Sequence, residues 1–339
     1  MSSIADYTMI KTLLKELFNH KTLSRQQARD VLVNIAKESY NQSEVVAFLT
    51  VFMMRPVTVE ELSGFRDALL ELCQRIDLSD FNTIDMCGTG GDGKNTFNVS
   101  TLASLVVAGA GAKVSKHGNY GVSSSCGSSN VMEYLGYQFT SDADQLRRQL
   151  DEANICFLHA PLFHPAMKAV GPIRKQLGLK TFFNMLGPMV NPSFPQNQLV
   201  GVFSVELARI YQYIYQQTDK NYSIVHALDG YDEISLTGDF KSITQNGETI
   251  YAPSDFGMNT VRPEEIFGGD TVPQAAEIFV QILEGKGTDA QNNVVLANAA
   301  LALQCYYPEK TIEQTILDAR QSLLDGKAAG VLAKLLSIA

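Results

Sequence analysis

The segment 85–101, DMCGTGGDGKNTFNVST, strongly limits how this chain can fold. A mostly apolar run at 84–87 leads into four glycines within residues 88–93, and a helix-like run of small residues begins at Asn98. Glycine accepts positive φ and lets backbone N–H groups approach an anion, and a helix N-terminus adds partial positive charge. The segment therefore predicts a strand, a phosphate-binding turn and the start of a helix.

A second loop with similar chemistry follows within twenty residues, at 116–129, KHGNYGVSSSCGSS. It comes after a strand-like run at 112–115 and before a helical pattern formed by Val131, Met132 and Leu135. Its lysine and its hydroxyl groups are able to bind phosphate oxygens. Either loop alone could equally be an ordinary surface turn. Two of them after neighbouring strands favour a ligand with two separated phosphate groups.

Composition narrows the class of protein. A chain of 339 residues with 45% hydrophobic and 19% charged residues is long enough for a full core and two structural units. Its net charge of −9 argues against a nucleic-acid surface, which needs a basic stripe. The five cysteines are widely spread, with no spacing typical of a zinc site, so we expect neither a disulfide framework nor zinc.

No signal for membrane insertion or export is visible in the sequence. No apolar run approaches the roughly 18 residues of a membrane span. The first residues, MSSIAD, lack the basic and apolar regions of a signal peptide. We therefore expect a cytoplasmic protein.

The first seventy residues predict a small helical unit. Apolar residues recur at helical spacing in 9–18, and Ser24 with Gln27 and Thr58 with Glu61 have the spacing of capping boxes. A third helix is predicted at 43–54, before Pro56. The apolar faces of these helices need a packing partner, and a second subunit is one candidate.

From residue 84 onward, strand-like and helical patterns alternate. The predicted strands are 84–87, 112–115, 155–158, 199–203 and 224–227. This alternation predicts an α/β fold with a mostly parallel central sheet flanked by helices. The carboxyl ends of parallel strands lie at one edge, so the loops that follow them should meet there. A later hairpin is predicted from the strands 234–236 and 241–244, with Asn246-Gly247 as a turn. The segments 290–303 and 311–338 are predicted to be helical.

Asp232 and Glu233 follow the predicted strand 224–227. Magnesium prefers few carboxylates together with water and phosphate oxygens, so this pair is a candidate metal site. In isolation it would be an ordinary solvated acidic loop, but beside two phosphate loops the metal interpretation is favoured. Asp92 and Asp229 are candidates for additional or supporting ligands.

Arg174 lies on a predicted helix at 165–177, where its guanidinium could bind a carboxylate with two hydrogen bonds or be a surface charge. The segment 184–192, NMLGPMVNP, is a shaped loop because its Gly-Pro and Asn-Pro steps cannot continue a helix. It could be a binding wall or a simple bend. His159 and His164 have no nucleophile placed near them by sequence, so covalent catalysis is not indicated.

Five motifs occur here in the same order as in the anthranilate phosphoribosyltransferase family. They are GTGGDG at 88–93, NVST at 98–101, KHGN at 116–119 with Ser123-Ser124, the Gly-Pro and Asn-Pro loop, and Asp232-Glu233. The chain resembles this family over nearly its whole length. The resemblance implies transfer of the phosphoribosyl group of phosphoribosyl pyrophosphate to the amine of anthranilate, with release of pyrophosphate, in tryptophan biosynthesis. It also implies Mg²⁺ as cofactor.

The resemblance implies a homodimer with two domains per subunit, related in fold to pyrimidine nucleoside phosphorylases. A helical domain would comprise 1–73, with 165–195 returning to it, and an α/β domain would comprise 74–339. The helix at 165–177 and the Gly187-Pro188 loop would face the hinge between the domains, where anthranilate enters.

Site residues follow from the same resemblance. Those implied to bind phosphoribosyl pyrophosphate are Gly88, Gly91, Asp92, Thr96, Asn98, Val99, Ser100, Thr101, Lys116, His117, Gly118, Asn119, Ser123, Ser124 and Ser128. Those implied to bind anthranilate are Gly88, Asn119 and Arg174, and those implied to bind magnesium are Ser100, Asp232 and Glu233. One departure is Tyr120, since many members have arginine after KHGN.

Two other functions are compatible with the same core but less favoured. A pyrimidine nucleoside phosphorylase usually carries an extra C-terminal domain and needs no second phosphate loop. A non-catalytic relative that binds nucleic acid should be basic and could lose the acidic pair, whereas this chain is acidic and keeps Asp232-Glu233.

Overall fold

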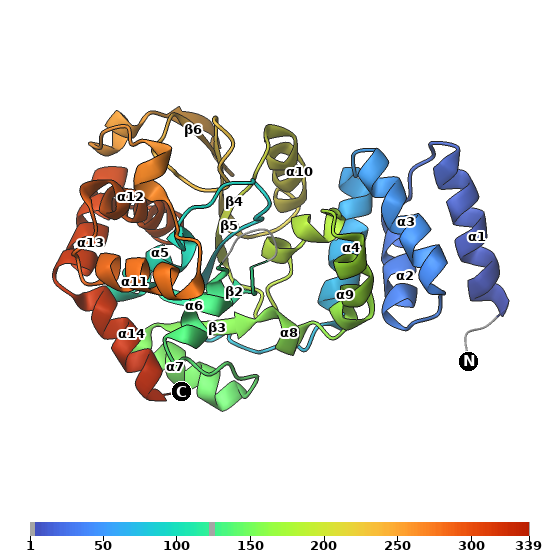
Figure 1. Ribbon diagram of the computed structural model, residues 1–339, viewed down its shortest axis with the longest axis horizontal. Coiled ribbons are helices and arrows are strands. Elements are labelled where there is room, and N and C mark those ends of the chain that lie inside the picture. The colour runs from blue at the N-terminus through green and yellow to red at the C-terminus, as the bar shows by residue number, and fades with distance from the viewer. Residues whose placement is uncertain (1–3, 122–125, 339) are drawn as a thin grey trace. The chain divides into compact units, whose positions relative to one another are not determined.

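The computed structural model describes residues 4–121 and 126–338, with side chains described from residue 10 onward. The chain divides into two compact units (Figure 1). One unit contains the residues up to Arg75 together with Ala160–Pro192, and the other contains Ile76–His159 and Ser193–Ala339. Within the described ranges, none of the helices has both the length and the apolar character needed to span a bilayer.

The first unit is helical. Its helices are α1 (Ile4–Phe18), α2 (Arg25–Ala36), α3 (Gln42–Met54), α4 (Val59–Leu72), α8 (Ala160–Phe163) and α9 (Ala166–Leu177), with short 3₁₀ turns η1 (Phe182–Met185) and η2 (Gly187–Met189). The predicted capping boxes at the starts of α2 and α4 are confirmed. Four aromatic rings from α3, α4 and η1 pack together in the core: Phe48, Phe52, Phe65 and Phe182. The 3₁₀ turn η1, which carries Phe182, therefore packs in the core of the helical unit.

The second unit is built on a seven-stranded sheet. The strands are β1 (Thr83–Gly88), β2 (Lys113–Gly118), β3 (Ile155–His159), β4 (Asn197–Gly201), β5 (Asn221–Ala227), β6 (Phe240–Thr244) and β7 (Gly247–Tyr251). Their spatial order is β3-β2-β1-β4-β5-β6-β7, with parallel pairing from β3 to β5 and antiparallel pairing of β5 with β6 and β6 with β7. The predicted mostly parallel α/β sheet is confirmed.

Helices cover both faces of this sheet. They are α5 (Val99–Gly109), α6 (Ser128–Tyr134), α7 (Ala143–Ala153), α10 (Val205–Tyr215), α11 (Val272–Leu283), α12 (Asp289–Tyr306), α13 (Ile312–Leu324) and α14 (Lys327–Ile338), with 3₁₀ turns η3 (Pro253–Phe256) and η4 (Pro263–Ile266). The chain leaves β1 toward β2 and leaves β4 in the opposite direction toward β5. Right-handed crossovers therefore place α5 and α10 on opposite faces, as Figure 1 shows.

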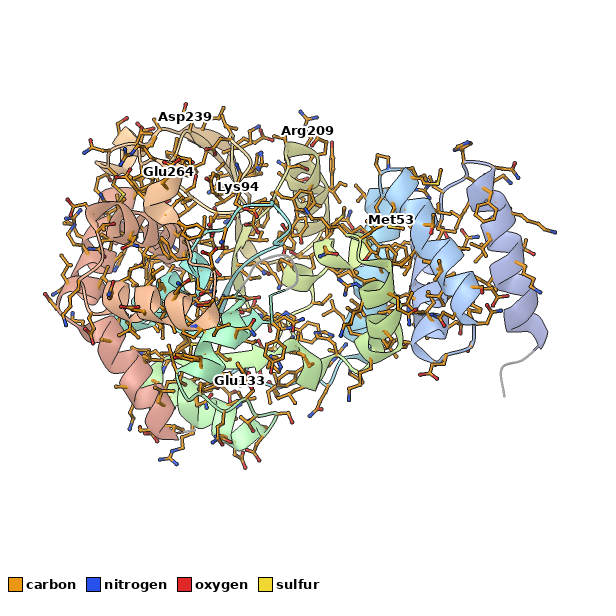
Figure 2. All side chains as sticks on the ribbon, in the orientation of Figure 1. Met53, Lys94, Glu133, Arg209, Asp239 and Glu264 are labelled. Carbon is orange, nitrogen blue, oxygen red and sulfur yellow. The ribbon has the colours of Figure 1, made fainter. Side chains whose placement is uncertain are left out.

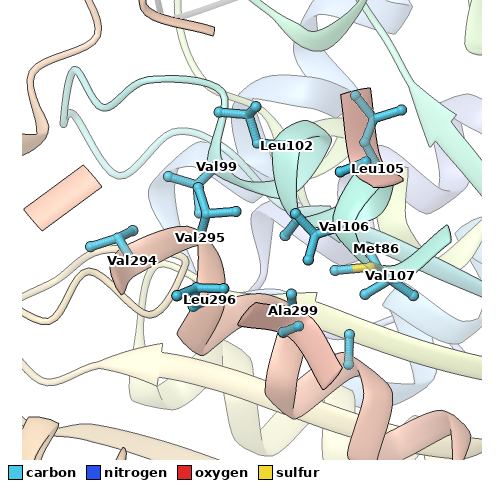
Figure 3. Close-up of a cluster of buried hydrophobic side chains, with 14 of the residues drawn as sticks. Met86, Val99, Leu102, Leu105, Val106, Val107, Val294, Val295, Leu296 and Ala299 are labelled. Carbon is cyan, nitrogen blue, oxygen red and sulfur yellow. The ribbon is translucent and has the colours of Figure 1, made fainter. Parts of the chain in front are cut away.

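The main core lies between β1, α5 and α12 (Figure 3). Helix α5 has apolar residues on nearly every side, and Leu102, Leu105 and Val106 are fully buried. Val294 and Val295 of α12 belong to the same cluster. Burying a side chain of this size contributes about 1.5–3 kcal/mol, so the helix that follows the glycine turn is firmly held.

Two sequence-based boundaries were wrong. Residues 234–236 form no strand, because Leu236 has φ of +58° and the backbone of Ile234 is hydrogen-bonded to Asn298. The hairpin instead joins β6 to β7 through the predicted Asn246-Gly247 region. In addition, β2 continues through Lys116 and His117 to Gly118, so these polar residues lie on a buried strand rather than on a loop.

Candidate active site

The site lies where the order of the strands reverses, between β1 and β4. Gly88 at the end of β1 pairs with Gly201 at the end of β4, and the N–H of Thr89 donates to the carbonyl of Gly201 at 2.9 Å. The chain leaves these two strands in opposite directions. In open α/β sheets, ligands bind outside the carboxyl ends of the strands at this position. The glycine turn at 88–93 begins there.

The glycine turn uses backbone conformations that other residues rarely adopt. Gly90, Gly91 and Gly93 have φ of +65°, +79° and +77°. Since such φ values place a Cβ atom in steric conflict, the turn depends on glycine at these positions. The N–H groups of Thr89 and Gly90 donate to Gly201 and Asp232, and the turn leads toward the start of α5, where a helix N-terminus is suited to an anion.

The acidic loop after β5 packs directly onto the ends of β1 and β4. A Cβ atom added to Gly201 would lie 1.5 Å from the carbonyl oxygen of Asp232. The N–H of Gly90 donates to Oδ2 of Asp232 at 2.6 Å. The Lys94 ammonium lies 4.5 Å from the centre of the Tyr231 ring, which links the same two loops again (Lys94 is labelled in Figure 2). The glycine turn and the acidic pair therefore form one local structure.

Asp232 is buried, and Glu233 is partly buried. Burial, and then the negative charge of Asp92, raise the pKa of Asp232 to about 7. Burial and the charge of Asp232 raise the pKa of Glu233 well above its usual range, although a hydrogen bond with Thr96 opposes this shift. The Oε1 atom of Glu233 is buried and has no hydrogen-bond partner among the residues described here. Charged oxygens in this state are costly unless a cation is close.

This donor set fits magnesium. Within the described part of the chain, no cluster of three or more histidine, cysteine, aspartate or glutamate side chains could enclose a metal. Mg²⁺ does not need such a cluster, because it usually takes one or two carboxylates and completes its shell with water and substrate phosphates. Asp232 and Glu233 offer that number of carboxylates, with an unpaired oxygen on Glu233.

Lys116 of β2 contacts both the strand before the glycine turn and the helix after it. It is only 1% exposed, and its Nζ donates to the carbonyl of Met86 at 2.5 Å and to Oγ of Ser100 at 3.3 Å. Burial lowers the pKa of its ammonium group, and the neighbouring Cys87 and Asp85 oppose that shift. The structure thus brings together Lys116 from the second motif and Ser100 from the first. Among the described residues, the hydroxyl of Ser100 contacts Lys116 and not the acidic pair.

Asp85 is a buried carboxylate that sequence analysis did not identify. It is 0% exposed and accepts hydrogen bonds from the N–H of His117 at 3.0 Å and from Nε2 of Gln198 at 3.4 Å. Asp85 therefore joins β1, β2 and β4 beneath the site. The only sign of this role in the sequence is an acidic residue within an otherwise apolar strand.

The second loop is tied to the first turn of α6. The carbonyl of Asn119 accepts from the N–H of Ser129 at 3.1 Å and from Oγ of Ser128 at 3.2 Å. A Cβ atom on Gly118 would lie 2.6 Å from Oγ of Ser128, so this approach requires glycine. Asn98 donates to the carbonyl of Cys126 at 3.1 Å, which connects the start of α5 to the second loop. Ser123 and Ser124 lie outside the described residues.

The other predicted site residues have mainly supporting contacts. Asp92 accepts from the N–H of Lys94 at 3.0 Å, and Thr96 forms a backbone bridge with Phe267. Val99 and Thr101 are buried in the first turn of α5, and their N–H groups donate to the carbonyls of Phe97 and Asn98. Asp229 accepts a hydrogen bond from Thr237, which makes it a loop-stabilising residue.

Arg174 lies on α9 in the helical unit. Its Nη2 donates to Oδ1 of Asn184 at 3.3 Å, and its guanidinium lies 5.2 Å from the centre of the Phe183 ring. Burial lowers its pKa, and no carboxylate of the described residues forms an ion pair with it. Its Nε is buried without a hydrogen-bond partner in the same part of the chain. A partly buried guanidinium without an anionic partner is suited to an anionic ligand.

Comparison with known proteins identifies the family. Residues 80–329 match the glycosyl transferase family, a/b domain, and residues 11–73 match the helical bundle domain of that family. An anthranilate phosphoribosyltransferase from Christiangramia forsetii is 61% identical over 319 residues, which cover 94% of this chain and 96% of that protein.

Solved structures agree with the sequence comparison. Anthranilate phosphoribosyltransferase from Saccharomyces cerevisiae, solved in complex with PRPP and Mg, has a TM-score of 0.90 and 28% identity, with 99% of this chain and 98% of that chain covered. The enzyme from Thermus thermophilus has a TM-score of 0.87 and 27% identity, with 96% of this chain and 98% of that chain covered. The chain belongs to the anthranilate phosphoribosyltransferase family.

Proposed function

We propose that this protein transfers the phosphoribosyl group of phosphoribosyl pyrophosphate to the amine of anthranilate. The products are N-(5-phosphoribosyl)anthranilate and pyrophosphate. The observation that carries the proposal is the hydrogen bond between the N–H of Gly90 and Asp232, because it places a phosphate-type turn and a buried acidic pair in one local structure. Such a combination suits a ligand with several phosphate groups and a divalent cation.

The proposed site for phosphoribosyl pyrophosphate comprises the residues given by the family resemblance. Gly88, Gly91 and the start of α5 would supply backbone donors, and Lys116 would supply a buried positive charge. Asp232 and Glu233 would hold Mg²⁺, whereas Ser100, which contacts Lys116, is proposed as a magnesium ligand from the family resemblance alone. When bound, the cation would neutralise negative charge on the departing pyrophosphate.

Catalysis by this chain would depend on position and charge. The amine of anthranilate is neutral at pH 7 and needs no strong base. The backbone N–H groups of the glycine turn would stabilise the leaving group, and Asn119 and Arg174 would orient anthranilate. Holding two reactants in line can contribute on the order of 7 kcal/mol or more.

The proposed assembly is a cytoplasmic homodimer formed through the helical unit. Two large apolar side chains of that unit support it, since Phe18 of α1 is 60% exposed and Met54 of α3 is 83% exposed. Light scattering would report the mass in solution. A monomer at micromolar concentration would contradict the dimer without affecting the proposed chemistry.

A direct assay tests the activity. Anthranilate fluorescence should decrease with time only when phosphoribosyl pyrophosphate and Mg²⁺ are both present, and addition of a chelator should stop the decrease. Phosphorolysis of thymidine or uridine should be absent, and single-stranded DNA should not shift in electrophoresis at physiological salt. No loss of anthranilate under these conditions would refute the proposed function.

A further inference from the structure

One side-chain oxygen bonds two glycines in the described part of the second loop. Oδ1 of Asn130 accepts the N–H of Gly121 at 2.9 Å and the N–H of Gly127 at 3.0 Å. These two residues flank 122–126, and Asn130 lies in the first turn of α6. The backbone N–H groups of Gly121 and Gly127 therefore share one side-chain acceptor.

Close backbone approach at the same point provides a second, independent feature. A Cβ atom on Gly127 would lie 2.2 Å from the backbone nitrogen of Gly121 and 2.6 Å from the carbonyl carbon of Tyr120. The φ of Gly127 is −81°, which any residue can adopt. Glycine is therefore required at this position by lack of space and not by backbone conformation.

The same helical turn also fixes the preceding part of the loop. Ser129 donates its N–H to the carbonyl of Asn119, and its Oγ lies 2.9 Å from Nδ1 of His159. The Tyr120 ring packs edge-on against His159, with ring centres 4.8 Å apart, and its hydroxyl donates to Glu133 of α6 at 3.4 Å (Glu133 is labelled in Figure 2). Asn130, in the same helical turn, adds the hydrogen bonds to Gly121 and Gly127.

We infer that Asn130 is a positioning residue for phosphoribosyl pyrophosphate. It acts through the backbone of Gly121 and Gly127, and this role rests on the proposed function. By bonding Gly121 and Gly127, Asn130 holds the backbone beside Asn119 and Ser128 before the substrate arrives, and so reduces the conformational entropy lost on binding. Loss of this contact should weaken binding of phosphoribosyl pyrophosphate and leave the chemical step and anthranilate binding largely unchanged.

Three variants and one control test the inference. Asn130→Ala removes the acceptor, Gly127→Ala forces the loop ends apart, and Asn130→Asp retains an oxygen acceptor in the first turn of α6, where negative charge is favourable. The control is Asn154→Ala, which removes a side-chain-to-backbone hydrogen bond of 3.1 Å to Ala108. Asn154 immediately precedes β3, at the amino end of the strand and away from the site.

For Asn130→Ala, which removes the shared acceptor, and Gly127→Ala, which displaces Gly121, we expect the KM for phosphoribosyl pyrophosphate to rise about ten-fold. The kcat and the KM for anthranilate should change less than about three-fold. Asn130→Asp should remain within about three-fold of the native KM. Hydrogen exchange of residues 119–121 and 126–130 should become faster in Asn130→Ala without substrate.

Two results would overturn the role of Asn130. One is an unchanged KM for phosphoribosyl pyrophosphate in both alanine variants. The other is a parallel loss of kcat, both KM values and melting temperature that matches Asn154→Ala, since that pattern indicates general destabilisation. Inactivity of the native protein would instead refute the proposed function before any variant is compared.

Discussion

Gly88 has no room for a side chain, because Oδ2 of Asp232 lies 2.3 Å from the position that a Cβ atom on Gly88 would take. The two residues are far apart in the sequence but adjacent at the end of the sheet. A change at Gly88 should therefore act on the acidic pair before it acts on the fold.

Gly88→Ala should lower turnover about ten-fold, because displacing the Asp232 carboxylate costs on the order of 1–3 kcal/mol. It should also reduce the rise in melting temperature that Mg²⁺ produces. Thermal unfolding with and without Mg²⁺ measures this second effect. Gly238→Ala is the matched control, since a Cβ atom there meets nothing within 4 Å. Equal behaviour of the two variants would show that the close contact has no functional consequence.

The double variant Asp232→Asn with Glu233→Gln should lose turnover by about a hundred-fold or more, because both charged oxygens offered to the cation are removed. Anthranilate binding should change much less. Steady-state kinetics at saturating Mg²⁺ would separate the two effects. Near-normal turnover in this variant would remove the acidic pair from the proposed mechanism.

Arg174→Ala should raise the KM for anthranilate about ten- to a hundred-fold, the range for losing a hydrogen bond to a charged group. The KM for phosphoribosyl pyrophosphate should stay roughly constant. Lys175→Ala, an exposed neighbour on the same helix, controls for loss of a positive charge. The reverse pattern of KM values would assign Arg174 to the other substrate.

Without metal, the protein should become less stable as pH rises from about 4 to about 7. The pKa of Asp232 is raised by burial from 3.8 to about 7, so the folded state keeps a proton that the unfolded chain releases. Its contribution to the free energy of unfolding is complete below pH 4 and is lost as pH approaches 7. The shift at Glu233 has the same direction.

The measurement is the difference in melting temperature between the native protein and Asp232→Asn, in chelator, at several pH values. This difference should fall as pH rises, and Mg²⁺ should restore stability at pH 8. A difference that grows with pH would mean that Asp232 is already ionised in the metal-free protein.

Most structural features that could be predicted from the sequence come from local motifs. The glycine turn after β1 and the capping box of Ser24 depend on neighbouring residues, and both are visible in a short window. The role of Asn130 was not predictable in this way, because its partner Gly121 is defined only by the folded loop. The sequence places Lys116 in a loop and the structure places it on β2, because a buried lysine breaks the apolar pattern by which a strand is identified.

The first turn of α5 lies beside the proposed ligand site. The side chains of Val99 and Thr101 in this turn are buried in the interior. Any substitution that reshapes this turn to alter substrate preference would also disturb the buried core around α5. Adaptation of the enzyme to new substrates should therefore proceed through more exposed positions such as Tyr120, whose side chain contacts His159 and Glu133 and lies outside the core around α5.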